Sequence, residues 1–301
     1  MSFININWYI ALAFCLIFFI GGRQLAEVPG ASPKERRAVG LFLLAFAIPA
    51  LLFPLAYLPG PIAVSPWYNT FRSVNRIELF SALVAPAAGY ATYTNSGSGY
   101  GQFRLPAPVG IRVLKPLAFP LCVLLISLNF AGPLLRPLSK DAVFKESWTE
   151  GGVITKSIDP AGGPAALITA MYGLNRFTGS ERDAVRGTYT DGAGTEFWYL
   201  ARYAANRGYR TKFIKPGNIE ELPTPSILPV AQSGSPDYSG PQGVGAPTIG
   251  AYVALLSNYE DGTLIIGDPA EGKLEMDVGE FIDRYGEPGL VLTLAPPKNK
   301  I

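Results

Sequence analysis

The sequence predicts an α-helical membrane part, residues 1–138, followed by an α+β domain that faces water, residues 139–301. Two observations support this division. Val39–Tyr57 and Leu117–Leu135 contain no charged residue, whereas charges are spread along Lys140–Arg284. Uncharged apolar segments are stable in hydrocarbon and charged segments require water, so the two halves are expected in different solvents.

Four apolar segments approach the length of about 20 helical residues that a bilayer core requires. They are residues 3–22, 38–58, 77–93 and 117–135. The first is expected to be a retained helix and not a signal peptide, because no positive residue precedes it. The third is the least hydrophobic, and a re-entrant or interfacial helix is its alternative. We count it as a span.

Lys and Arg in the short loops predict the orientation in the membrane. The first loop is the most basic, the third is also basic, the second carries Arg72 and Arg76, and the N-terminus has none. The basic residues of loops one and three are Arg23, Lys34, Arg36, Arg37, Arg104, Arg112 and Lys115. These loops are therefore expected in the cytoplasm, and the domain on the periplasmic side of a bacterial inner membrane. Without the third span the domain would lie in the cytoplasm.

Composition excludes several kinds of chemistry. The chain has no histidine, which removes the commonest general base and metal ligand. Cys15 and Cys122 both lie in apolar runs, where a thiol behaves as a small hydrophobe, and no disulfide is expected. The net charge of +2 is too small and dispersed for a nucleic-acid surface. We expect no metal, no cofactor and no nucleic acid.

The second half alternates helical and strand patterns. Ser180 and Thr195 are predicted N-caps, and Gly208 a C-terminal glycine. Asp261-Gly262 predicts a hairpin turn. Residues 232–247 are too rich in Gly, Pro and Ser to pack and are expected to form a loop. The expected helices are Ala165–Asn175, Glu181–Arg186 and Glu196–Asn206, and the expected strands Tyr209–Ile214, Ser226–Val230, Ile249–Ser257, Thr263–Gly267 and Gly289–Leu294.

Three stretches resemble the papain-like C39 peptidase family. Lys156–Ala166 (KSIDPAGGPAA) is similar to the family's glutamine, five variable residues and Cys-Gly-Pro-Ala-Ala. Gly194-Thr195, before a helix that ends at Gly208, is similar to the Gly-Thr and long helix that come next in the family. Gly250–Leu256 (GAYVALL) and Gly267–Gly272 (GDPAEG) resemble His-Tyr-Val-Val-Leu and an Asp-Pro-Ala-x-Gly turn. The resemblance implies a papain-like fold over about 140 residues.

The catalytic residues of that family are replaced in this chain. The resemblance puts Lys156 at the position of the oxyanion glutamine, Gly162 at the nucleophilic cysteine and Ala251 at the histidine. Only Asp268, at the position of the orienting aspartate, is retained. Because residues 139–301 contain no cysteine and the whole chain contains no histidine, thiol–imidazole catalysis is excluded. The sequence therefore predicts a pseudoenzyme.

Other candidate residues have simpler interpretations. Asp268 is expected to cap a turn. A Ser157–Lys156 dyad is disfavoured, because adjacent residues of an extended segment point to opposite sides. Glycines 240, 243 and 245 do not match a phosphate-binding loop. Four acidic residues are expected to be solvated, with a carboxylate site for glycoside or metal chemistry as the alternative; they are Asp261, Asp268, Glu271 and Glu275. Four aromatic residues at helical spacing are expected to form core, with a binding role as the alternative; they are Phe197, Trp198, Tyr199 and Tyr203.

The predicted function is a non-catalytic accessory or scaffold subunit of a larger membrane protein complex, for example a respiratory, photosynthetic or export complex. Its expected partners are other membrane subunits and the lipid bilayer. The alternatives are a module that binds an extended peptide in a secretion system, and an enzyme of altered chemistry that uses Asp268, Lys156 or a serine.

Overall fold

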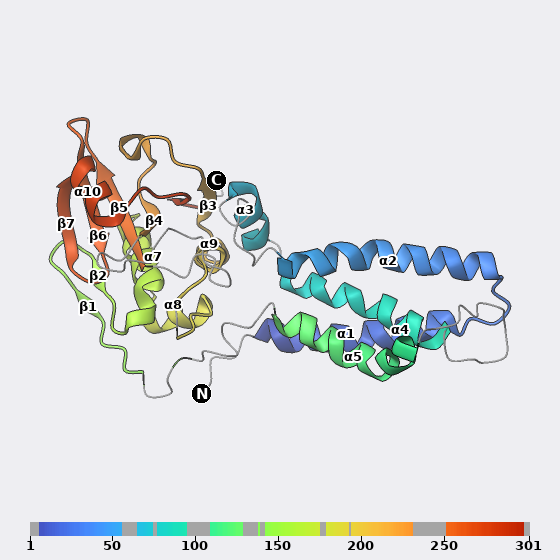
Figure 1. Ribbon diagram of the computed structural model, residues 1–301. Helices are drawn as coiled ribbons and strands as arrows, with labels where there is room; N and C mark the ends of the chain where they lie inside the picture. The colour runs from blue at the N-terminus through green and yellow to red at the C-terminus, as the bar shows by residue number, and fades with distance from the viewer. Residues whose placement is uncertain are drawn as a thin grey trace. The chain divides into compact units, whose positions relative to one another are not determined.

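The computed structural model describes residues 6–55, 65–74, 77–94, 109–128, 138, 142–174, 179–192, 194–230 and 251–297. The chain forms two compact units (Figure 1). One combines the C-terminal part from Gly132 with the segment Tyr57–Asn75, and the other contains Asn5–Ala56 and Arg76–Ala131. The predicted boundary at residue 138 is therefore incomplete, because a segment from the first half of the chain belongs to the second unit.

The helical unit consists of four α-helices and one 3-10 helix among its described residues. Most of its buried side chains are small, and they include Ala11, Cys15, Ala47, Ala82 and Ala85, although Ile126, Tyr90 and Leu43 are buried as well. Large apolar side chains on α1, α2 and α5 are exposed instead. Small residues inside and large ones outside are typical of helices that pack in lipid. The elements are α1 (Ile6–Ala26), α2 (Pro33–Leu55), η1 (Ile77–Leu83), α4 (Val84–Thr94) and α5 (Val109–Leu128).

Two glycines allow α1 and α4 to approach closely. A Cβ atom at Gly22 would lie 2.1 Å from the Pro86 carbonyl oxygen, and one at Gly89 would lie 2.1 Å from the Phe19 carbonyl oxygen. Both distances are far below van der Waals contact, so neither position accepts a side chain without separating the helices.

Polar side chains connect α1 to α5. The Trp8 indole donates a hydrogen bond to Ser127 Oγ at 3.1 Å. Cys15 and Cys122, for which the sequence suggested no partner, are hydrogen-bonded to each other. They are free thiols, as expected. The sequence does not show which faces of α1 and α5 meet.

The number of membrane spans differs from the prediction of four. Among the described residues, one helix, Asn7–Ala26, is long and apolar enough to cross a membrane, and Pro116–Ser127 is a shorter apolar helix. The predicted span 38–58 lies in a helix whose first turns carry Lys34, Glu35, Arg36 and Arg37. The predicted span 77–93 is divided between η1 and the 11-residue α4. The parts of spans 38–58 and 117–135 after residues 55 and 128 lie outside the described residues.

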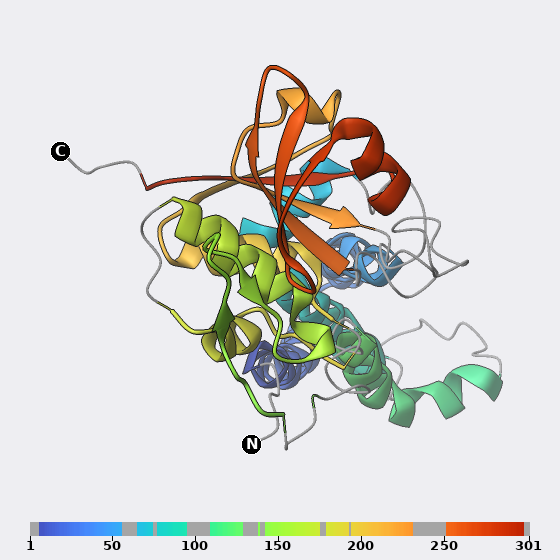
Figure 2. The same ribbon diagram turned by 90° about the vertical axis from the view of Figure 1, so that its left-hand side faces the viewer.

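The second unit is built on a six-stranded antiparallel sheet of order β3-β8-β4-β5-β6-β7 (Figures 1 and 2). Helices α7 and α9 pack on one face, around Phe197 and Leu200, and α10 packs on the other, around Phe281. The strands are β1 (Ser147–Trp148), β2 (Ile154–Thr155), β3 (Arg210–Ile214), β4 (Ser226–Val230), β5 (Ala251–Asn258), β6 (Thr263–Asp268), β7 (Gly272–Asp277) and β8 (Val291–Ala295), and the helices are α3 (Pro66–Val74), η2 (Asp159–Ala161), α7 (Gly162–Gly173), α8 (Glu181–Gly187), α9 (Phe197–Asn206), η3 (Ile219–Glu221) and α10 (Val278–Tyr285).

Most predicted elements of this unit are confirmed. Ser180 caps α8 by accepting a hydrogen bond from the Asp183 N–H, and Gly208 and Gly262 have positive φ angles of 87° and 86°. Thr195 was predicted wrongly as a cap, because its hydroxyl lies 2.6 Å from Thr190 Oγ1 and α9 begins after Glu196 without a side-chain cap. The prediction for residues 232–247 lies outside the described residues.

Two elements were missed by the sequence prediction. The first is β7, in which buried and exposed positions alternate and the exposed ones are charged. The second is α10, whose N-cap is Asp277. A short charged strand that continues directly into a short helix gives a weak local pattern. Both elements lie next to Asp268 and complete its surroundings.

Helix α3 is an addition from the loop between two apolar helices, and it packs on α9. The Arg202 guanidinium of α9 donates to the carbonyl oxygens of Arg72 at 2.6 Å and Ser73 at 3.3 Å. It thereby closes the last turn of α3, where carbonyl groups lack helical partners. The Arg72 guanidinium lies 3.8 Å from the centre of the Trp198 ring. The two helices therefore fold as one unit.

We predict that Gly22→Ala destabilises the helical unit by about 1–3 kcal/mol, because the added methyl group forces α1 and α4 apart. The matched control is Gly21→Ala, since a Cβ at Gly21 meets nothing within 4 Å. Denaturant unfolding in detergent, followed by far-UV circular dichroism, measures both. Equal midpoints for the two variants would contradict the close packing of α1 on α4.

Candidate functional site

The segments that carry the positions assigned by the family resemblance to nucleophile and base contact each other. Gly162 begins α7, and Ala251 begins β5. A Cβ atom at the following residue, Gly163, would lie 3.1 Å from the Tyr252 ring, and the Tyr252 hydroxyl donates a hydrogen bond to the Thr195 carbonyl at 2.8 Å. The start of α7 therefore contacts the start of β5. Among the described residues, a Cβ at Gly162 would meet nothing within 4 Å.

Lys156 is tied to the turn that follows Asp268. Its backbone N–H donates to the Pro269 carbonyl at 2.8 Å. Its ammonium group pairs with Asp159 at 3.2 Å. The structure thus brings position 156 to the turn that begins at Asp268, but the Lys156 charge is directed to a surface carboxylate.

Both carboxylate oxygens of Asp268 have partners within the chain. Oδ1 accepts a hydrogen bond from the Ala270 N–H at 2.6 Å, which is the predicted turn cap, and Oδ2 accepts one from the Tyr285 hydroxyl at 2.5 Å. Burial, followed by the hydrogen bond to Asp268, raises the pKa of Tyr285 well above its usual range. Tyr285 is therefore a proton donor at any ordinary pH, and the pair fixes α10 to the end of β6.

Ala251 and Asp268 lie on the same face of the sheet. Ala251 packs on the apolar cluster around Phe281, and Asp268 contacts Tyr285 of α10. Their neighbours face α7 instead, because Tyr252 belongs to the other cluster and a Cβ at Gly267 would lie 2.8 Å from Thr169.

Ser157 takes part in a buried network and not in a dyad with Lys156. Its backbone N–H donates to Glu181 Oε1 at 2.8 Å, and its hydroxyl contacts both Glu181 Oε2 and the Lys145 carbonyl oxygen. The Glu181 N–H donates to Glu146 Oε1 at 2.7 Å. This network connects the segment before β1 to α8, and it was not predicted from the sequence.

The carboxyl of Glu181 is buried beside Ser157. The Ser157 hydroxyl lies within hydrogen-bond reach of both the Glu181 carboxyl and the Lys145 carbonyl oxygen, and it has one proton to donate. Glu181 is 0% exposed. Burial raises the pKa of its carboxyl, hydrogen bonds from Ser157 oppose this in part, and the Glu146 charge raises it further. A neutral carboxylic acid at this site removes the cost of a buried charge.

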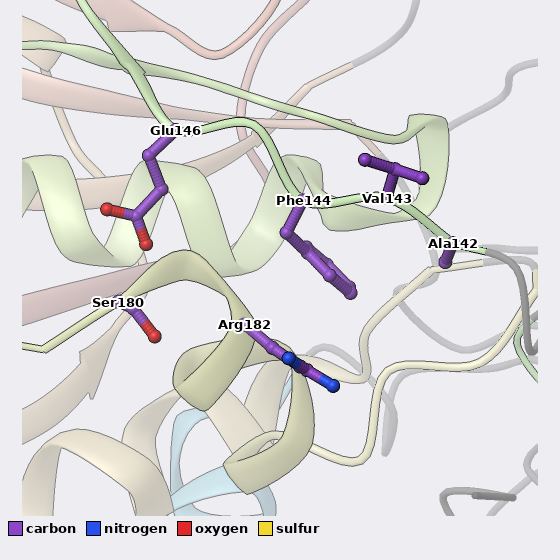
Figure 3. A pocket seen from close by; sticks show the side chains of 6 residues that line it. All are labelled: Ala142, Val143, Phe144, Glu146, Ser180 and Arg182. Atoms are coloured by element: carbon purple, nitrogen blue, oxygen red, sulfur yellow. The ribbon is translucent and has the colours of Figure 1, made fainter.

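An open groove lies beside this network (Figure 3). Phe144 and Arg182 point into the space between the extended segment 142–146 and α8. Glu146 is thus shared between the groove and the network. The groove is lined by Ala142, Val143, Phe144, Glu146, Ser180 and Arg182.

The remaining candidates have structural roles. Phe197, Trp198, Tyr199 and Tyr203 are all buried, as predicted for core residues. Glu271 pairs with Arg284 of α10. Among the described residues, no group of three or more Asp, Glu or Cys side chains is arranged to hold a metal ion. Glycines 240, 243 and 245 lie outside the described residues.

The C-terminal half is similar to C39-type peptidase domains of transporters, as its sequence resemblance predicted. The peptidase domain of ComA from Streptococcus, a bifunctional ABC transporter of a quorum-sensing pathway, is 21% identical over 51% of this chain and 99% of its own, with a TM-score of 0.38. A double-glycine-motif protease of an AMS/PCAT transporter, solved with its leader peptide, is 16% identical over 51% and 99%, with a TM-score of 0.38.

The N-terminal C39-like domain of a toxin-secretion ATP-binding protein from Vibrio parahaemolyticus is 16% identical over 46% and 98% of the two chains, with a TM-score of 0.32. No family model and no curated protein matches the sequence. These are likenesses, and the chemistry of those domains is not carried over to this chain.

We predict that Glu181→Gln reduces the dependence of stability on pH. The folded pKa of Glu181 is raised above its ordinary value of 4.5, so its contribution is present below that value and is lost as pH rises through the folded pKa. The amide stays neutral, and the variant should unfold at a higher temperature than the native protein at pH 8, with each kcal/mol corresponding to about 2–4 °C.

Intrinsic fluorescence of the detergent-solubilised full chain between pH 4 and pH 9 provides the measurement. Glu150→Gln, at an exposed turn, is the control for loss of one negative charge. If the unfolding temperature of Glu181→Gln changes with pH in the same way as that of the native protein over this range, the raised pKa of Glu181 is refuted.

Proposed function

We propose that this protein is a non-catalytic, membrane-anchored protein whose C39-like domain serves as an accessory or scaffold subunit of a larger membrane protein complex, for example a respiratory, photosynthetic or export complex. The observation that carries the proposal is the lack of reactive groups at the positions that the family resemblance assigns to catalysis. Gly162 stands at the position of the nucleophile, where a Cβ would meet nothing within 4 Å among the described residues, Ala251 stands at the position of the base, and the chain has no histidine. Both cysteines lie in α1 and α5.

The surroundings of the retained aspartate support a structural role. Asp268 has a hydrogen-bond donor on each oxygen, and both donors belong to the chain itself. A carboxylate in this state is available neither as a general base nor as a metal ligand without loss of those bonds. An enzyme of altered chemistry at Asp268 is therefore disfavoured.

A second candidate function is binding of an extended peptide. It is favoured by one observation, the free space at Gly162 next to the first residues of β5. A segment placed there can contact the cleft without being cleaved, because no nucleophile is present. This candidate and the scaffold share the same surface and differ in the ligand.

The anchoring part of the proposal rests on the helical unit. Large apolar side chains cover the outside of α1, α2 and α5, and most of the side chains buried between the helices are small. We propose that α1, α2, the pair η1–α4, and α5 all cross the bilayer. Helix α3 precedes η1, the C39-like domain follows α5, and the contact of Arg202 with α3 requires both to be on one side. Residues 76–131 must then cross the membrane an even number of times, which supports two crossings.

We predict that the full chain, purified from its native membranes in mild detergent, carries other membrane proteins in fixed proportion, measured by mass spectrometry. Gly162→Trp should remove any partner that docks in the cleft, since the indole has room to occupy it. Gly217→Trp is the matched control, because a Cβ there also meets nothing within 4 Å. A chain that purifies alone would contradict the subunit proposal, and a partner retained by Gly162→Trp would contradict docking at the cleft.

The proposed sidedness predicts a labelling pattern. Gly60→Cys, between α2 and α3, and Gly217→Cys, in the C39-like domain, should react with a membrane-impermeant maleimide in intact spheroplasts. Val28→Cys, in the first loop, should react only after lysis. Reaction of the first two from opposite sides overturns the even number of crossings, and reaction of both only after lysis overturns the periplasmic location.

A further inference from the structure

Helix α3 has one face in the protein core and one face exposed. Tyr68, Asn69, Arg72 and Ser73 are 5% exposed or less. Trp67, in the first turn of the same helix, is 71% exposed. This is a much larger exposure than that of the other described tryptophans of the C39-like unit, Trp148 at 41% and Trp198 at 1%.

Trp67 is held in a fixed orientation by a neighbour one turn away. Its ring is stacked on Phe71, with 5.5 Å between the ring centres and 6° between the planes. Residues at positions i and i+4 share one face of a helix, so the two rings form a flat aromatic surface. In water a fully exposed indole is unfavourable, whereas an amphipathic ring of this type is stable at the boundary between lipid headgroups and acyl chains.

The chain keeps α3 close to the apolar helices. Residues 75 and 76 alone separate it from η1, and residues 56–65 separate it from α2. At about 3.3–3.6 Å per residue, a linker of two residues places Val74 within about 11 Å of Ile77. If the apolar helices are in the bilayer, α3 lies at its surface.

The buried face of α3 is bound to α9 of the C39-like domain. Arg202 of α9 binds the carbonyl groups of Arg72 and Ser73, and Arg72 donates to the Tyr68 hydroxyl at 3.0 Å while it covers Trp198. These contacts involve buried groups and fix α3 to α9. Whatever holds the exposed face of α3 therefore also orients the domain.

We propose that α3 is an interfacial anchor, in which Trp67 stacked on Phe71 inserts into the headgroup–acyl boundary of the bilayer and thereby fixes the orientation of the C39-like domain. The partner is the lipid surface itself. This inference rests on the membrane anchoring proposed above, and it adds a second, peripheral contact that the apolar helices do not supply. Aromatic residues at this boundary bury about 5–10 Å below the headgroups.

The test uses the full chain reconstituted in phosphatidylcholine–phosphatidylglycerol vesicles, with and without lipid brominated at the 6,7 position of the acyl chain. Trp8→Phe, Trp67→Phe and Trp148→Phe give the contribution of each tryptophan to the emission by difference. Trp67 is expected to lose roughly half of its emission in brominated vesicles and to be protected from aqueous iodide. Trp148, which contacts Tyr172 of α7 in a tilted ring pair, is the exposed control. Its emission should be insensitive to brominated lipid and quenched by iodide.

The outcomes separate the interfacial anchor from the membrane anchor. If brominated lipid quenches Trp8 while iodide quenches Trp67, α1 is inserted in the bilayer but α3 is not, and the interfacial role of α3 is overturned. An unquenched Trp8 overturns the membrane anchoring as well. Trp67 that is protected from iodide only in native membranes, and not in lipid vesicles, identifies a protein partner for this face and overturns the lipid surface as its occupant.

Discussion

The close contact of α7 with the sheet is the constraint on which the site depends. At Gly163 a Cβ atom would lie 3.1 Å from the Tyr252 ring, and at Gly267 it would lie 2.8 Å from Thr169. Tyr252 cannot move away, because it is buried and its hydroxyl is bonded to the Thr195 carbonyl. Two glycines therefore bring the start of α7 against β5 and β6. The start of α7, which carries position 162, lies against the strand that begins at position 251 for this reason.

Two hydrogen-bond networks hold the segments around α7 in place without any reactive group. Asp268 has a structural function that is independent of a neighbouring base, since it caps its own turn and binds Tyr285 of α10. Ser157 and the buried Glu181 join the segment before α7 to α8. Each network connects elements that are distant in the sequence, so both restrict the movement of these elements relative to one another.

The contact between α3 and α9 joins two parts of the chain that the linear order keeps apart. Arg202 supplies the hydrogen bonds that the last carbonyl groups of α3 lack, and these groups would be costly to bury without them. The loop between two apolar helices thus becomes part of the C39-like domain. The C-terminal unit is therefore connected to the apolar helices through the ends of this loop as well as through the segment after α5.

The sequence by itself determined the division into an apolar and a charged half, most strands of the sheet, the caps at Ser180 and Gly208, and the resemblance that places Lys156, Gly162, Ala251 and Asp268 in a family pattern. It also excluded thiol–imidazole catalysis, because absence of a residue type is visible without a structure. The expectation of a cap at Thr195 was wrong, and among the described residues one helix is long and apolar enough to cross a membrane where the sequence suggested four spans. Only the tertiary structure decided that Asp268 binds Tyr285, that Ser157 binds Glu181 and that Arg202 binds α3. These contacts join residues far apart in the chain, and local periodicity contains no information about which distant surfaces meet.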